Sequence, residues 1–139
     1  MKLQRSLLLA CMALAGASVA FAQDRVVYHF DNTEVQGLKG LRNIRNHLDH
    51  DPQARIAVVA HADGVDFLLE GKKDRHGNDY APLVKALRAR GVSFEVCDIT
   101  LRSRNLDRDQ FLPETEFTPS GVVRMARLQT QEGAAYIKP

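Results

Sequence analysis

Cys97 is the residue of this 139-residue sequence with the clearest capacity for chemistry. It ends the apolar stretch at 92–97 and stands directly before Asp98-Ile99-Thr100, which predicts a strand that finishes in a thiol and a helix that follows at once. Free N–H groups at a helix N-terminus stabilise an anion and lower the pKa of a cysteine, so this placement favours the reactive thiolate. The alternative interpretation is packing, because a free cysteine also behaves as a small hydrophobic residue.

The predicted strands 26–30 and 56–60 also end in polar residues, among them Asn32 and His61. In an open α/β sheet, ligands bind in the crevice beyond the carboxyl ends of the strands. We therefore expect Asn32 and His61 to line one crevice with Cys97. His61 suits either a structural hydrogen bond or proton transfer to the thiol, because the pKa of imidazole lies near neutrality.

Four polar residues follow Cys97 within the next helix. Asp98 and Thr100 suit either helix capping or the orientation of a substrate beside the thiol. Arg102 and Arg104 add positive charge that could steer an anionic sulfur donor. These residues complete the candidate site predicted around Cys97.

The remaining motifs exclude several kinds of site. The polar loop at 70–79 carries Lys72, Lys73 and Arg75, which indicates either a solvated loop or a docking surface for an acidic partner. No glycine-rich phosphate loop follows Phe30, and neither a Ser-His-Asp arrangement nor a cysteine-rich metal site has useful spacing. We therefore expect no cofactor and no bound metal.

Changes in hydrophobic period define the elements that must position these residues. Strands are predicted at 26–30, 56–60, 92–97 and 134–137, and helices at 34–50, 64–69, 80–90, 99–105, 107–112 and 118–131. Thr118 and Pro119 are interpreted as the N-cap and first turn of the last helix. Strands that alternate with helices indicate parallel pairing and right-handed crossovers, and the unbroken apolar run at 56–60 is typical of the sheet centre.

The first 22 residues have the features of a signal peptide. Lys2 and Arg5 precede an apolar run at 7–20, which at about 14 residues is too short for a spanning helix, and cleavage is expected after Ala22. Cys11 lies too early in this run for the alternative of a lipid anchor. The prediction is an exported, periplasmic or secreted protein with a single domain at 23–139 and no stable membrane anchor.

Export would leave a neutral domain. The sequence has 19 Lys and Arg residues against 17 Asp and Glu, and removal of Lys2 and Arg5 makes the two totals equal. The charge balance thus gives no reason to expect nucleic acid as a partner. Cys97 would be the only cysteine left, so the domain must be stable without an internal disulfide.

The segment Gly91-Val92-Ser93-Phe94-Glu95-Val96-Cys97-Asp98-Ile99-Thr100-Leu101, followed by Phe117-Thr118-Pro119-Ser120-Gly121-Val122-Val123, resembles the DsrE/DsrF-like family. The resemblance implies a three-layer, flavodoxin-like α/β domain with a mostly parallel sheet that assembles into homotrimers or hexamers. It also implies that Cys97 carries persulfide sulfur between a donor and an acceptor protein.

Two functions follow as hypotheses. The first is an exported sulfur carrier or sulfurtransferase-type protein that accepts sulfane sulfur on Cys97. The alternative is a non-catalytic oligomeric module of the same fold that binds a small ligand or a protein.

Overall fold

The computed structural model describes residues 23–139. The predicted signal peptide, with Cys11 and the cleavage position after Ala22, lies outside the described residues. The elements in chain order are β1 (Arg25–Asn32), α1 (Thr33–His50), β2 (Arg55–Asp63), η1 (Asp66–Leu68), α2 (Ala81–Ala89), β3 (Ser93–Cys97), α3 (Asp98–Arg104), η2 (Arg108–Gln110), β4 (Thr115–Thr118), α4 (Gly121–Glu132) and β5 (Ala135–Ile137).

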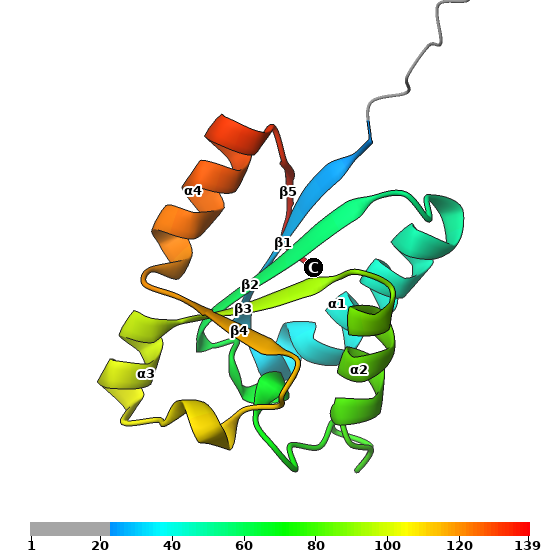
Figure 1. The fold of residues 1–139 in the computed structure, drawn as a ribbon. Coiled ribbons are helices and arrows are strands. Elements are labelled where there is room, and N and C mark those ends of the chain that lie inside the picture. The colour runs from blue at the N-terminus through cyan, green and yellow to red at the C-terminus, as the bar shows by residue number, and fades with distance from the viewer. Residues whose placement is uncertain (1–22) are drawn as a thin grey trace, which may run out of the picture.

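The five strands form one all-parallel sheet in the order β4-β3-β2-β1-β5. Strand β2 occupies the centre, as its unbroken apolar run predicted. Helices α1 and α2 cover one face and α4 covers the other, so the domain has three layers (Figure 1). The predicted α/β fold class is confirmed.

The larger part of the core lies between the sheet and helices α1 and α2. Phe67 is central to it, with its ring centroid 5.0 Å from that of Phe30 and 6.3 Å from that of Phe94. Two glycines let α1 approach these aromatic rings: a Cβ at Gly40 would lie 2.3 Å from the Phe30 ring, and one at Gly37 would lie 2.7 Å from the Tyr80 hydroxyl oxygen. Glycine has a low helix propensity, but at these two positions it allows α1 to pack closely against the aromatic rings.

Helix α4 covers the less apolar face of β3, which carries Glu95 and Cys97. Glu95 is buried, and its carboxylate accepts two hydrogen bonds from Arg124 of α4, at 2.7 and 3.0 Å. A smaller apolar cluster centred on Val59 and Met125 completes this interface. The polar residue on this strand face is therefore buried in an ion pair with a helix and is not exposed to solvent.

The prediction that Thr118 caps the last helix is wrong. Thr118 ends β4, a strand that the sequence did not reveal, and it pairs in register with Cys97. The N-cap is Ser120, whose side chain accepts a hydrogen bond from the Val123 N–H. Strand β4 has only four residues and is followed by Pro119, so its hydrophobic pattern is too short to indicate a strand.

The shorter predicted helices correspond to observed elements. The predictions at 99–105 and 107–112 match α3 and η2, and the prediction at 64–69 matches η1. Gly133 ends α4 in a left-handed conformation with φ of 68°, as expected for a helix C-terminus. No helix between residues 23 and 139 combines the length and apolar character that a membrane span requires.

Candidate thiol site

Cys97 lies where the ends of two strands meet the starts of two helices. It is the last residue of β3 and the N-cap of α3, so the helix predicted directly after the thiol is present. It also faces Gly121, the first residue of α4, where an added Cβ would lie 3.3 Å from the Cys97 Cβ. The start of α4 can approach the cysteine this closely because residue 121 has no side chain.

The surroundings of Cys97 favour the thiolate. Burial raises the pKa of the thiol, since only 5% of the residue is exposed. The backbone N–H groups of Gly121, Thr100 and Ile99 and the Thr100 hydroxyl lower the pKa by a larger amount, so it lies below its usual value. Hydrogen-bond donors at a helix start stabilise an anion in this way. The thiolate is therefore more populated at neutral pH than in an ordinary cysteine.

Thr100 joins α3 to the end of β2. Its buried side-chain oxygen accepts the Ala62 N–H at 2.9 Å. Ala62 adopts φ of 49°, a conformation that non-glycine residues seldom adopt. Arg104 holds the same residue from the other side, because its guanidinium donates to the Ala62 carbonyl at 3.0 Å and to Asp66 at 2.7 Å. These contacts fix the chain segment that follows His61.

His61 is brought to the same place as Cys97. A Cβ at Gly121 would lie 3.6 Å from the His61 Cβ, so His61 and Cys97 both pack against the first residue of α4. Nε2 of His61 is 2.6 Å from Nε2 of His29, and Nδ1 of His29 is 2.6 Å from the Tyr136 hydroxyl oxygen. The three side chains form a continuous hydrogen-bonded chain from Tyr136 on β5 to His61 on β2, the strand next to that of Cys97.

This chain can carry a proton in either direction. If the Tyr136 hydroxyl donates to Nδ1 of His29, then Nε2 of His29 donates to His61, and the opposite arrangement of donors satisfies the same contacts. The pKa of His29 is lowered, first by burial and then by the nearby charges of His61 and Lys138, while Asp31 opposes the shift. His29 therefore favours the neutral form, which can both donate and accept a hydrogen bond.

The other predicted site residues make structural contacts. Asn32 is the N-cap of α1 and accepts the Val35 N–H at 3.1 Å. The Asp98 carboxylate accepts two hydrogen bonds from Arg108, at 2.8 and 2.9 Å. Arg102 lies exposed in the last turn of α3, away from the helix start that carries the thiol. The structure thus groups Cys97, Thr100 and His61. The side chains of Asn32, Asp98 and Arg102 do not join this group.

The predicted crevice is partly closed by backbone packing. Gly64 lies against the end of β1, where an added Cβ would be 2.2 Å from the Phe30 carbonyl oxygen. The Phe67 N–H donates to the buried Thr33 side chain at 3.1 Å. The ends of β1 and β2 are therefore packed against each other. The candidate reactive group of this edge, the Cys97 thiol, lies at the end of β3.

Sequence reasoning missed His29 and Tyr136. Strand alternation alone places His29 on the same face as Val27, but it does not show which strand lies beside β1. The pairing of β1 with β5 supplies Tyr136, which is 107 residues away in the sequence. Among residues 23–139, no group of three or more His, Cys, Asp or Glu side chains is arranged to hold a metal ion.

These features define a class of protein: a three-layer α/β domain with an all-parallel sheet and a thiol at the start of a helix, at the carboxyl edge of the sheet. Within this class, the chain belongs to the DsrE/DsrF-like family, whose model matches residues 11–139. This membership assigns it a fold of the sulfur-relay type.

Two solved structures resemble the domain. The protein of unknown function MTH1491 from Methanobacterium thermoautotrophicum has 36% identity and a TM-score of 0.74, with 84% of this chain and 100% of that chain covered. The ychN protein from E. coli has 18% identity and a TM-score of 0.66, with 84% and 99% covered, and it supports the fold alone. No curated protein matches the sequence.

Proposed function

We propose that this protein is an exported sulfur carrier that accepts sulfane sulfur on Cys97 and passes it to a partner thiol. The observation that carries the proposal is the position of the thiol at the N-cap of α3 and against the first residue of α4, where N–H donors lower its pKa. A buried cysteine with a packing role alone would have a raised pKa. Membership of the DsrE/DsrF-like family supports the same chemistry.

The transfer needs no oxidant or reductant. The Cys97 thiolate attacks the outer sulfur of a donor persulfide R–S–SH, so that the new S–S bond gives Cys97–S–SH and the donor leaves as R–S⁻. An acceptor thiolate R′–S⁻ then attacks the outer sulfur of Cys97–S–SH. This step yields R′–S–SH and restores the Cys97 thiolate, and the N–H groups that stabilise the thiolate also make it a good leaving group.

We propose that His61 manages the proton. The departing R–S⁻ needs a proton at neutral pH, and His61, which packs against residue 121 together with Cys97, is the proposed source. Through His29 and Tyr136 the hydrogen-bonded chain leads away from Cys97 to the exposed side of β5, where Tyr136 is 45% exposed. The proton on His61 can thus be replaced from solvent after each transfer.

The direct test uses residues 23–139 as the native chain and as Cys97→Ser. Each is incubated with a persulfide donor, weighed intact by mass spectrometry, and weighed again after reduction. We expect a gain of one sulfur, about 32 Da, on the native chain alone, reversed by reductant. Iodoacetamide labelling of the same samples measures whether the thiol, at 5% exposure, can be reached in the folded protein.

An unmodified thiol that also resists alkylation would reject the sulfur-carrier proposal. It would favour the second hypothesis, a non-catalytic binding module, for which burial of Cys97 is the supporting observation. Under that hypothesis, Cys97→Ser would leave ligand binding and assembly unchanged. Under the sulfur-carrier hypothesis, the same substitution would abolish the function.

Export and self-assembly form part of the proposal. Export is tested by N-terminal sequencing of the protein from the compartment outside the inner membrane, with Gln23 expected as the first residue. Assembly as a trimer or hexamer is supported by exposed apolar side chains at the starts of three helices, namely Val35 in α1, Ile99 in α3, and Val122 and Val123 in α4. Native mass spectrometry would give the number of copies, and a monomer would reject this part.

A further inference from the structure

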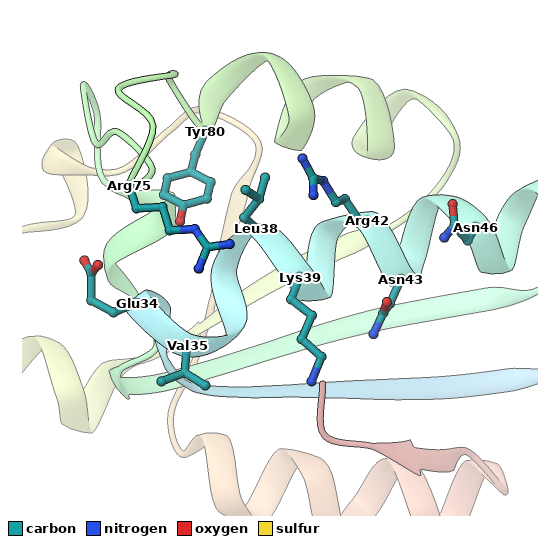
Figure 2. A pocket seen from close by; sticks show the side chains of 9 residues that line it. All are labelled: Glu34, Val35, Leu38, Lys39, Arg42, Asn43, Asn46, Arg75 and Tyr80. Atoms are coloured by element: carbon teal, nitrogen blue, oxygen red, sulfur yellow. The ribbon is translucent and has the colours of Figure 1, made fainter.

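The outer surface of α1 carries a groove that is separate from the thiol site. It has a volume of about 420 Å³ and runs along the helix beneath the loop that precedes α2 (Figure 2). Helix α1 packs on the sheet face opposite to α4, whereas Cys97 faces α4. The groove thus has no part in the sulfur chemistry proposed above. We call it the α1 groove and define it by Lys39, Arg42, Asn43, Asn46, Arg75 and Tyr80.

The residues that line the α1 groove carry a net positive charge. Among residues 23–139, no carboxylate lies within 4.0 Å of the charged groups of Lys39, Arg42 or Arg75, although basic residues elsewhere, such as Arg90 and Arg108, form ion pairs. The one acidic residue at the groove, Glu34, already has Lys72 at 3.6 Å. Three cations against this one carboxylate leave a net positive charge on one concave surface, which favours an anionic ligand.

Helical spacing puts the polar donors on one side of the groove. Lys39, Arg42, Asn43 and Asn46 follow one another at i, i+3, i+4 and i+7, so their side chains project from the same face of α1. The two asparagine amides add neutral N–H donors to the charged ones. An oxyanion can therefore accept hydrogen bonds from several directions along this face.

Arg75 supplies the opposite side of the groove from a hydrogen-bonded turn. The Asp74 carboxylate accepts the N–H groups of His76 at 2.8 Å and Asn78 at 3.0 Å, and the Tyr80 N–H donates to the Lys72 carbonyl at 3.1 Å. Figure 2 shows the Arg75 guanidinium extending toward α1 beside the Tyr80 hydroxyl. The cation is thus directed over the groove.

The end of the groove near the start of α1 is apolar. Tyr80 is 4% exposed and packs its ring over Gly37, with Leu38 beside it (Figure 2). Val35, at 67% exposure, extends this apolar surface. The volume lies within the usual range for small-molecule sites, about 300–1,000 Å³.

We propose that the α1 groove binds a small organic oxyanion, a phosphate or sulfonate attached to an apolar body. The oxyanion lies between Arg42 and Arg75, because guanidinium groups bind such oxygens in pairs. The apolar body lies on Leu38 and Val35. Binding at this place is independent of Cys97 and does not rest on the sulfur-carrier function.

A matched pair of fluorescent probes tests the proposal on residues 23–139, which contain the whole sheet and its core. The first probe, 8-anilinonaphthalene-1-sulfonate, has a sulfonate on an apolar ring system, and N-phenyl-1-naphthylamine has the same rings without the charge. We expect saturable binding of the sulfonate and binding of the neutral probe at least about tenfold weaker, because charge-assisted hydrogen bonds are lost. Inorganic sulfate should displace the sulfonate probe.

Exposed arginines provide the variants and their control. Arg42→Ala and Arg75→Ala should each weaken binding of the sulfonate probe about tenfold, while Arg127→Ala, an exposed cation on α4, should leave it within about twofold. Cys97→Ser should have no effect. Equal affinity in the native chain and the Arg42→Ala/Arg75→Ala double variant would overturn the proposal. So would an equal loss in Arg127→Ala, or equal binding of the neutral probe. Circular dichroism confirms that each variant remains folded.

Discussion

Nε2 of His29 lies 2.6 Å from Nε2 of His61, and the two imidazole rings meet end to end, with planes 20° apart and centroids 4.8 Å apart. At this distance one nitrogen must donate and the other must accept. The pair therefore holds one proton between the rings, and protonation of both rings would leave two donors facing each other. This contact links the thiol site to β1 and β5.

The His29–His61 contact predicts a loss of stability in mild acid. Burial and the charge of His61 lower the pKa of His29 in the folded state from the value of 6.5, so the unfolded chain takes up the proton first as the pH falls. The associated stability is present above about pH 6.5 and is lost as the pH falls through the folded pKa. We expect the free energy of unfolding to decrease between about pH 7.5 and pH 5, and His29→Gln to flatten this dependence.

Urea titrations across this pH range measure the effect, with His76→Gln in the exposed 70–79 loop as the control. Asp31 does not interfere, because its hydrogen bond to Lys138 lowers the pKa of this carboxyl and moves its titration to more acidic solution. If the native chain and His29→Gln gave parallel pH profiles, the imidazole pair would have no influence on stability.

Thr100→Val is expected to raise the pKa of Cys97. The substitution removes the hydroxyl that donates to the thiolate and also the acceptor of the Ala62 N–H. At pH 7 the rate of alkylation by iodoacetamide should fall roughly threefold to tenfold, and stability should fall by about 1–2 kcal/mol. The rate measured as a function of pH reports the thiol pKa directly. Thr118→Val, on the neighbouring strand beside Cys97, is the matched control and should keep the native pH profile.

Gly121→Ala should separate thiol reactivity from stability. Alanine raises helix propensity by about 1 kcal/mol, but its Cβ would lie 3.3 Å from the Cys97 Cβ and would push the Gly121 N–H away from the sulfur. We expect stability within about 1 kcal/mol of the native value and slower alkylation of Cys97. Gly133→Ala should do the reverse, because residue 133 has φ of 68° and no neighbour near its missing side chain. Unchanged alkylation in Gly121→Ala would show that this contact does not tune the thiol.

Arg124→Met should be among the most destabilising single changes on the α4 face. It leaves the Glu95 carboxylate, which is 7% exposed, without the partner that donates to it at 2.7 and 3.0 Å. Removing one member of a buried pair costs about 3–5 kcal/mol, and replacing both members with apolar residues restores much of the loss. Urea denaturation of Arg124→Met and of Glu95→Leu/Arg124→Met measures both effects.

The exposed pair of Arg25 with Glu132 provides the comparison for this prediction. Its atoms are 3.5 Å apart and both side chains are more than 40% exposed, so Arg25→Met should cost less than about 1 kcal/mol. Equal losses in Arg124→Met and Arg25→Met would mean that burial of Glu95 adds nothing to the cost.

Much of the fold could be predicted because its signals are local. The apolar run of β2, the helical spacing of apolar residues in α1 and the end of α4 at Gly133 each depend on residues close to one another in the sequence. Strand β4 escaped this reasoning because four residues carry too little periodicity, and its last residue, Thr118, was mistaken for a helix cap. The resemblance around Cys97 also gave the family before the sheet order was known.

By itself, the sequence determined that an α/β domain would carry one thiol at the end of a strand and the start of a helix, since the pattern of neighbouring residues predicts both elements. Only the tertiary structure decided what surrounds that thiol. Strand order and register bring Gly121 and His61 to Cys97, and place His29 beside Tyr136 across 107 residues. These contacts are set by how sheet and helix faces bury their apolar surface together, which is a property of the whole chain and not of any segment.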